Sequence, residues 1–217
     1  MNTKRIITWG SFIVIVGLII WGMIAANNKA EREQAVVASP EEITEMDWVK
    51  GNATSTVILM EYSDFQCPAC AIYFPLVERL FAESVGGFRF VYRHFPLSQH
   101  ANAVPAAQAT EVAGKQNKFW EMYEMIFTKQ TDWENSKDAK TIFSGYAETL
   151  GLDMEKFVLD FDSKEIIDKI NADQKSGLKV GVDSTPTFYL NGKKISPRDY
   201  EEFKKLINDA ITTTDNS

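Results

Sequence analysis

The stretch VILMEYSDFQCPACAIYFPLVERLF, residues 57–81, combines a short apolar run, a pair of closely spaced cysteines and a segment with helical spacing. The run 57–62 is nearly continuous in apolar residues, which is typical of a buried strand. After the cysteines, apolar side chains recur at helical intervals, and Pro68 suits the first position of a helix. The stretch therefore predicts a strand, then the motif Cys67-Pro68-Ala69-Cys70, then a helix.

The sequence on either side of this stretch adds further strands. Residues 88–94 alternate between apolar and polar side chains, which predicts a second strand after the helix and hence a βαβ unit. Near the other end of the domain, residues 187–190 and 193–195 flank Asn191-Gly192, a strong hairpin signal. Ser196, followed by a proline, predicts the start of a closing helix.

Helical spacing prevails between these two β segments. Gly114 predicts the end of the first helix of this region, and Asp162 with Glu165 predicts the start of the last. A βαβ unit, a block of helices, and a hairpin with a helix predict one α/β domain over residues 51–213, with a helical insertion at about 101–180. We expect a short tail at residues 214–217.

The N-terminal residues predict a membrane anchor. Residues 6–26, IITWGSFIVIVGLIIWGMIAA, carry no charge and are long enough to cross a bilayer as a helix. Lys4 and Arg5 precede this run and favour a cytoplasmic N-terminus, which would place the later domain outside the cytoplasm. The alternative is a cleaved signal peptide, although the run is long for one and ends in a poor cleavage site. We expect a tip and anchor at 1–26 and a polar linker at 27–50.

Composition narrows the classes of function. The apolar fraction of 45% is ordinary for a globular protein and excludes a disordered or fibrous chain. The formal net charge is −7, and no run of lysine or arginine occurs. Because nucleic acids are bound through a concentrated positive field, we do not expect a nucleic acid as a partner.

The spacing of the two cysteines indicates chemistry rather than a structural crosslink. A disulfide stabilises most when it closes a long loop, and Cys67 and Cys70 close almost none. At a helix N-terminus, unpaired N–H groups and the helix dipole favour a thiolate at Cys67. Cys70, one turn further, could then resolve a mixed disulfide on Cys67. The alternative is a zinc site with His94 and His100, but the gap from Cys70 to His94 is longer than in a zinc finger.

The residues alone do not decide the roles of two further positions. Glu61 lies six residues before Cys67 on the predicted strand, where it is either a buried proton carrier for Cys70 or a solvent-facing acid. Thr185-Pro186 precedes a predicted strand and reads as a turn. The helically spaced aromatic residues Phe119, Trp120, Tyr123 and Phe127 favour packing within the domain over a substrate groove.

Four segments resemble DsbA-like oxidoreductases: DFQCPAC at 64–70, YRHFPL at 92–97, KFWEMY at 118–123 and GVDSTPTFYLNG at 181–192. The resemblance implies a thioredoxin-like fold with a helical insertion, preceded here by the N-terminal transmembrane helix. It also implies that Cys67 is the nucleophile and Cys70 the resolving cysteine. Pro186 would be a cis-proline beside them.

The resemblance also assigns supporting roles. Glu61 matches the family's buried acid. Thr185 would present its backbone to an extended substrate, next to Pro68 and Ala69 of the motif. Strongly oxidising members of the family carry a histidine where this chain has Ala69, so we expect a less oxidising pair.

These roles predict an extracytoplasmic thiol-disulfide oxidoreductase acting on exported proteins, with oxidase favoured over reductase or isomerase. Its partners would be exported substrates, a quinone-linked membrane protein that reoxidises the cysteines, and membrane lipid around the anchor. No bound cofactor or metal is expected. The alternative from another class is an anchored chaperone or peptide-binding module with an inert disulfide.

Overall fold

The computed structural model describes residues 39–40, 42–84 and 87–215. The expected anchor at 6–26 and most of the expected linker lie outside the described residues. No helix among the residues described is long and apolar enough to cross a membrane. Residues 39–217 form one compact unit.

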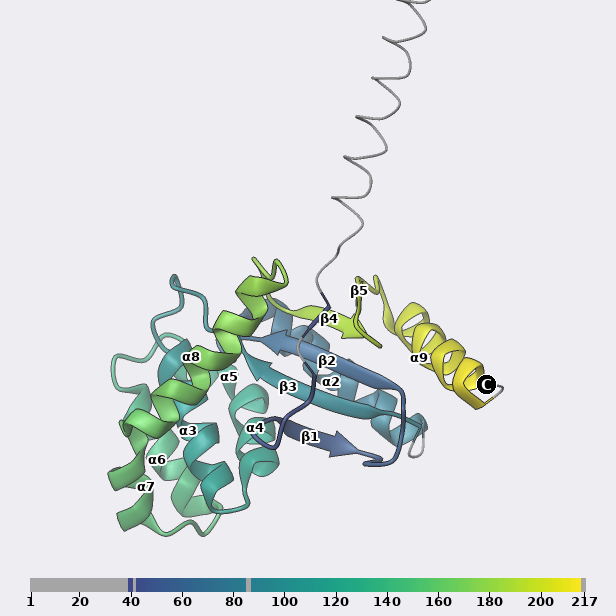
Figure 1. Ribbon diagram of the computed structural model, residues 1–217. Coiled ribbons are helices and arrows are strands. Elements are labelled where there is room, and N and C mark those ends of the chain that lie inside the picture. Colours follow the sequence, from purple (N-terminus) through teal and green to yellow (C-terminus); the bar gives the residue numbers. More distant parts are fainter. Residues whose placement is uncertain (1–38, 41, 85–86, 216–217) are drawn as a thin grey trace, which may run out of the picture. The chain divides into compact units, whose positions relative to one another are not determined.

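A five-stranded sheet forms the centre of this unit (Figure 1). Its strands are β1 (Trp48–Gly51), β2 (Ile58–Ser63), β3 (Arg89–His94), β4 (Thr187–Leu190) and β5 (Lys193–Ile195), in the order β1-β3-β2-β4-β5. Strands β2 and β3 pair in parallel and the other neighbours pair antiparallel. The predicted βαβ unit and hairpin are confirmed. Asn191 and Gly192 both have positive φ, as the two-residue turn of the hairpin requires.

Two helices, α2 (Pro68–Glu83) and α9 (Tyr200–Asp215), pack through aromatic side chains contributed by one face of the sheet. The ring of Phe188 on β4 lies 5.4 Å from Tyr73 of α2 and 5.0 Å from Phe203 of α9. Because side chains alternate along a strand, residues at every second position of β2 face these helices. Leu59 belongs to this core, and Met60 belongs to the smaller core on the opposite face. Glu61 therefore faces the α2 side.

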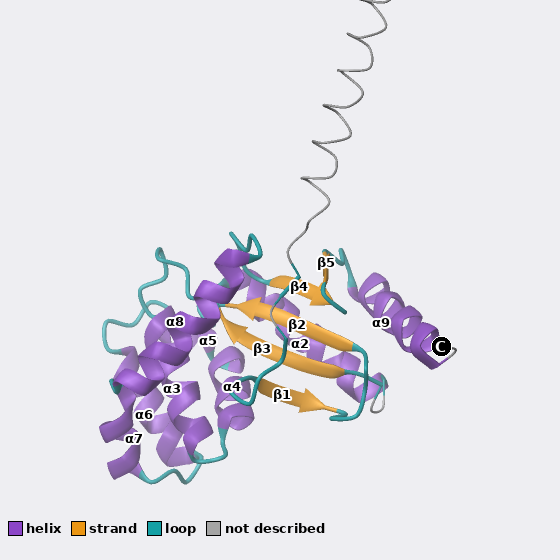
Figure 2. Ribbon diagram, in the orientation of Figure 1, coloured by secondary structure: helices purple, strands orange, loops and turns teal. Residues whose placement is uncertain are grey.

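The remaining helices form the predicted insertion. Figure 2 shows them gathered beyond the ends of β2 and β3 at which the strand arrows point. These helices are α3 (Ala103–Lys115), α4 (Phe119–Thr128), α5 (Gln130–Trp133), α6 (Ala139–Thr149), α7 (Met154–Phe161) and α8 (Lys164–Lys179). The insertion thus stands at the edge of the sheet where the cysteine motif follows β2.

Strand β1 crosses the boundary that we expected between the linker and the domain. It pairs with β3, and Asp47 just before it forms a bidentate ion pair with Arg93 at 2.7 and 2.9 Å. Both side chains of the pair are buried. Removing one partner of such a pair would leave a buried charge, so residues 47–51 are integral to the domain rather than linker.

Three helix boundaries differ from the sequence expectation. Helix α3 continues through Gly114 to Lys115. A Cβ at Gly114 would lie 2.3 Å from the indole of Trp48, so this glycine makes room for Trp48 and does not end the helix. Helix α8 begins after Ser163 rather than Asp162, whose carboxylate instead binds Lys140 at 2.6 Å. Helix α9 begins at Tyr200 rather than near Ser196, and the side chain of Asp199 caps it by accepting the N–H of Glu202 at 2.9 Å.

Candidate active site

The cysteine motif lies where β2 ends and α2 begins. Cys67 is the N-cap residue of α2, with extended backbone at φ −69° and ψ 122°, and Pro68 is the first helical residue. Both cysteines are free thiols. Cys67 is 7% exposed and Cys70 is fully buried at 0%, so an incoming sulfur can reach only Cys67. Pro68 is exposed and Ala69 half-buried beside it.

The two thiols are electrostatically unequal. The pKa of Cys67 is lowered to about 5, chiefly by a hydrogen bond from the Cys70 thiol. The N–H groups of Cys70 and Ala69 lower this pKa further, whereas burial raises it. Burial raises the pKa of Cys70 well above its usual range, and the bond to Cys67 and the nearby charge of Glu61 raise it further. At neutral pH the pair therefore holds one thiolate, on Cys67, and one proton, on Cys70.

This asymmetry predicts how the reduced protein titrates. The ultraviolet absorbance of the thiolate should rise with a midpoint near pH 5, far below the ordinary cysteine pKa of about 8.5. In a Cys67→Ser variant this transition should disappear, because Cys70 stays protonated. A wild-type midpoint above pH 8 would mean that the helix N-terminus does not activate Cys67.

Glu61 lies beneath the cysteines on the central strand. It is 2% exposed, and its register partners are Tyr92 of β3 and Phe188 of β4, so the solvent-facing alternative is wrong. Burial raises its pKa to about 8, and the nearby Ser63 side chain acts in the opposite direction. One oxygen of its carboxyl group has no hydrogen-bond partner. Glu61 is therefore protonated at neutral pH and can exchange a proton with its surroundings.

Thr185 and Pro186 complete the immediate surroundings of Cys67. The Thr185–Pro186 peptide bond is cis, as the family resemblance implies, and precedes β4 directly. The Cys67 Sγ lies 3.3 Å from the carbonyl oxygen of Thr185. The motif and the cis-proline segment, more than a hundred residues apart in sequence, thus meet at one edge of the sheet.

The motif itself is held by residues that we did not predict. Asp64 accepts hydrogen bonds from the N–H groups of Gln66 and Leu97 and from the ring of His100 at 2.7 Å. The bond from Asp64 to Gln66 is an Asx turn, a pattern that sequence reasoning could have recognised. The side-chain amide of Gln130 donates to the carbonyl groups of Phe65 and Cys67, and no local pattern indicates this contact.

The aromatic residues of α4 pack inside the domain. Phe119, Tyr123 and Phe127 are buried, as predicted, and Trp120 is partly buried against the same core. The ring of Phe65, two residues before Cys67, lies 4.7 Å from that of Phe127. This packing anchors the entry to the motif.

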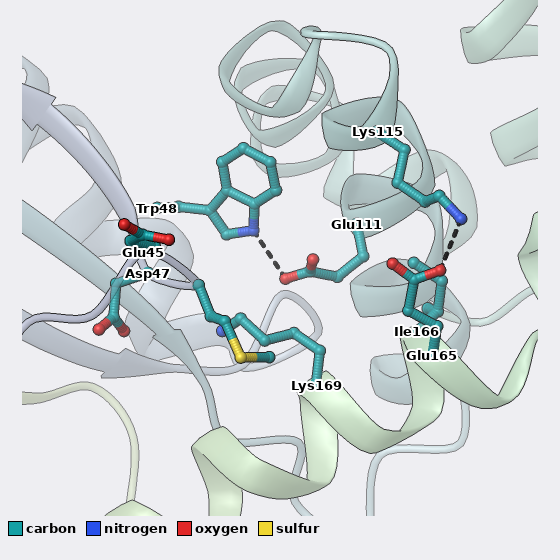
Figure 3. Close-up of a pocket in the computed structure, with 9 residues that line it drawn as sticks. Glu45, Asp47, Trp48, Glu111, Lys115, Glu165, Ile166 and Lys169 are labelled. Atoms are coloured by element: carbon teal, nitrogen blue, oxygen red, sulfur yellow. Dashed lines mark hydrogen bonds and ion pairs between the residues drawn. The ribbon is translucent and has the colours of Figure 1, made fainter.

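A metal site that includes the cysteines is not present among the residues described. The side chains there that could jointly hold an ion are His94, Glu111 and Asp173, without either cysteine. Asp173 already binds the ammonium group of Lys169 at 2.6 Å. Figure 3 shows the pocket beside this cluster, in which Glu111 accepts the indole N–H of Trp48 at 2.7 Å. Neither cysteine belongs to this cluster, so the zinc alternative, which needs Cys67 and Cys70 as ligands, has no support among the residues described.

Comparison with known proteins identifies the fold. The sequence model of a family described as Thioredoxin matches residues 43–209. BdbD from Bacillus subtilis is 23% identical, and its structure matches with a TM-score of 0.71 over 80% of this chain and 97% of that protein. Alpha-DsbA1 from Wolbachia pipientis is 19% identical, with a TM-score of 0.71 over 79% of this chain and 94% of that protein. The chain shares the fold of these proteins.

Curated relatives are similar over only part of their length. A Na(+)/H(+) antiporter NhaA of Herminiimonas arsenicoxydans is 32% identical over 186 residues, which are 85% of this chain and 29% of the antiporter. The antiporter NhaA 1 of Mycolicibacterium gilvum is 34% identical over 153 residues, 69% of this chain and 24% of that protein. The chain therefore spans less than a third of the length of these relatives.

Proposed function

The chain belongs to the thioredoxin family, and we propose that it is a thiol-disulfide oxidoreductase that passes disulfides to exported proteins through Cys67 and Cys70. The observation that carries this proposal is the inequality of the two thiols. Cys67 is accessible and has a pKa of about 5, whereas Cys70 is buried and its pKa is raised. A pair of this kind separates the sulfur that meets the substrate from the sulfur that closes the cycle.

The proposed reaction starts from the Cys67–Cys70 disulfide. A substrate thiolate attacks Sγ of Cys67, the bond between the two cysteines breaks, and Cys70 leaves and takes up a proton. A second substrate thiolate then attacks the substrate sulfur of the mixed disulfide and releases Cys67 as a thiolate. The substrate dithiol is oxidised by two electrons and the cysteine pair is reduced. The low pKa of Cys67 makes it a good leaving group in the second step.

Glu61 is suited to supply the proton that Cys70 takes up. It is protonated at neutral pH because its pKa is about 8. It also lies near enough to Cys70 for the ionisation of one group to affect the pKa of the other. A buried acid of this kind can give a proton to the departing thiolate and recover it when the pair is reoxidised. Water would carry the proton over any gap between the two groups.

The surroundings of Cys67 suit an extended peptide. Thr185 lies against the Cys67 sulfur, so a substrate joined to Cys67 would run beside the Thr185 backbone and pair with it as an added strand. Pro68 is exposed and Ala69 partly so, and both would touch the substrate from the helix side. Contacts with the backbone would allow many substrate sequences.

The cellular setting follows from the N-terminal sequence. An apolar anchor at 6–26 with Lys4 and Arg5 before it would hold the domain outside the cytoplasm, in contact with exported proteins. Reoxidation would then come from a quinone-linked membrane partner. Antiport is not proposed, because the chain covers only 29% of the Herminiimonas antiporter.

The test is the redox equilibrium of the full-length protein in detergent against glutathione. We expect a potential on the oxidising side of thioredoxin, whose value is about −270 mV, but below the value of about −120 mV of the strongest oxidants, because Ala69 gives no help to the thiolate. A potential near that of thioredoxin would assign the protein to the reductases. No exchange at all would favour a chaperone or peptide-binding module with an inert disulfide.

A further inference from the structure

A buried glutamine of the helical insertion, Gln130, binds the backbone of the cysteine motif. Gln130 is the first residue of α5 and is 7% exposed. Its side-chain amide donates to the carbonyl oxygen of Phe65 at 2.7 Å and to that of Cys67 at 3.2 Å. A side chain from the insertion thus holds the backbone on either side of Gln66.

Gln66 makes a second link to the insertion. Its side-chain amide donates to the carbonyl oxygen of Glu134 at 2.6 Å, and its side-chain oxygen accepts the N–H of Asn102 at 2.6 Å. The indole N–H of Trp133 donates to Ile126 at 2.9 Å and fixes α5 on α4. Gln130 and Gln66 therefore make two separate links between the motif and the insertion.

The bond to the carbonyl of Cys67 bears directly on the orientation of its sulfur. That carbonyl also accepts the N–H of Ala71 at 3.2 Å, the bond that begins α2. Its direction sets ψ of Cys67, and ψ sets where Sγ lies relative to the N–H groups of Ala69 and Cys70. These N–H groups at the helix N-terminus stabilise negative charge on the sulfur.

We propose that Gln130 is a positioning residue that holds Cys67 where the first N–H groups of α2 stabilise its thiolate, so that the helical insertion helps to set the reactivity of the nucleophile. This inference rests on the proposed exchange through Cys67. Gln130 touches neither the sulfur nor the substrate, and it acts through the backbone of the motif.

Replacing Gln130 with methionine tests this role, because methionine keeps the size of the side chain and removes both donors. The thiolate titration of reduced Gln130→Met should have its midpoint raised by about half a pH unit, since one hydrogen bond acts indirectly on the sulfur. The equilibrium with glutathione should shift about threefold towards a less oxidising pair, because the reduced form loses thiolate stabilisation.

Gln108→Met is the matched control. Gln108 is 6% exposed, and its amide donates to the carbonyl oxygen of Phe161 at 3.1 Å, within the insertion and away from the motif. Both variants should unfold at lower temperature than the wild type, and only Gln130→Met should change the titration and the equilibrium. Should Gln130→Met fail to fold, Gln130→Asn, which keeps an amide with shorter reach, should change both readings in the same direction.

An unchanged midpoint and equilibrium in the Gln130 variants would overturn the inference, as would equal changes in the Gln108 control. Neither result would contradict the proposed function, because that function is tested by measurements on the wild-type protein. A wild-type protein whose Cys67 shows no low-pH titration and no exchange would instead refute the proposed function itself.

Discussion

Replacing Cys70 with serine is expected to trap the protein on its substrate as a mixed disulfide, whereas replacing Cys67 with serine should abolish exchange. Cys67 is the more exposed cysteine, and its pKa in the wild type is lowered to about 5, first of all by a hydrogen bond from Cys70. A serine hydroxyl at position 70 can donate the same bond, so Cys67 should stay ionised and reactive in Cys70→Ser. In Cys70→Ser no second thiol is left in the chain to displace the bound substrate. The mixed disulfide should therefore accumulate.

The measurement is a reaction of each reduced variant with a peptide disulfide, followed on non-reducing gels and by mass. Cys70→Ser should gain the mass of one peptide chain and lose it on reduction, and Cys67→Ser should gain nothing at neutral pH. The double variant is the control for chemistry at other groups. A stable adduct on Cys70 in Cys67→Ser would reverse the assigned roles of the two cysteines.

The part of the site that local sequence could predict is the part built from neighbours along the chain. The apolar run 57–62, the cysteine spacing and Pro68 specify strand, motif and helix, because each signal acts within a few residues. The hairpin at Asn191-Gly192 was predictable for the same reason, because few other residue pairs readily adopt positive φ at two successive positions.

The contacts that local sequence could not predict join distant segments. Asp47 pairs with Arg93 across 46 positions, and Gln130 reaches the carbonyl of Phe65 across 65. A short edge strand such as β1 has no pattern of its own, so its pairing with β3 becomes visible only in the fold. Polar side chains such as Gln130 look like ordinary surface residues until their partners are known.

Glu61 shows a different limit of sequence reasoning. Alternation along a strand tells which residues share a face, and it tells which face is buried only when the other face meets solvent. Strand β2 lies in the middle of the sheet, and both of its faces are covered by core side chains. Predicting the environment of Glu61 therefore requires knowing what packs on each face of β2.

Replacing Glu61 with glutamine is expected to stabilise the reduced protein increasingly as the pH rises from about 5 to about 8. Burial raises the pKa of Glu61 from 4.5 to about 8, so between these values the folded protein keeps a proton that the unfolded chain has lost. Its contribution to stability is complete below pH 4.5 and is lost as the pH approaches 8. At about 1.36 kcal/mol per pH unit, the loss at pH 8 is at most roughly 5 kcal/mol.

Cys67 contributes with the opposite sign, because its pKa is lowered from 9.0 to about 5 in the folded protein and its ionisation favours folding as the pH rises. The free energy of unfolding of the wild type can therefore change little with pH even though the contributions of Glu61 and Cys67 are each large, because these contributions have opposite signs. The difference between Glu61→Gln and wild type, measured by denaturant titration at several pH values under reducing conditions, isolates Glu61. That difference should be near zero below pH 4.5 and should grow up to pH 8.

Glu111→Gln is the matched control for Glu61→Gln. Glu111 is also buried, but its carboxylate accepts hydrogen bonds from Trp48 and His94, so its loss should destabilise the protein. Glu61→Gln should gain stability and at the same time exchange disulfides more slowly, because Cys70 loses its nearby proton donor. A stability difference that does not change with pH would show that Glu61 is ionised in the folded protein. Glu61 could not then act as the proton donor to Cys70.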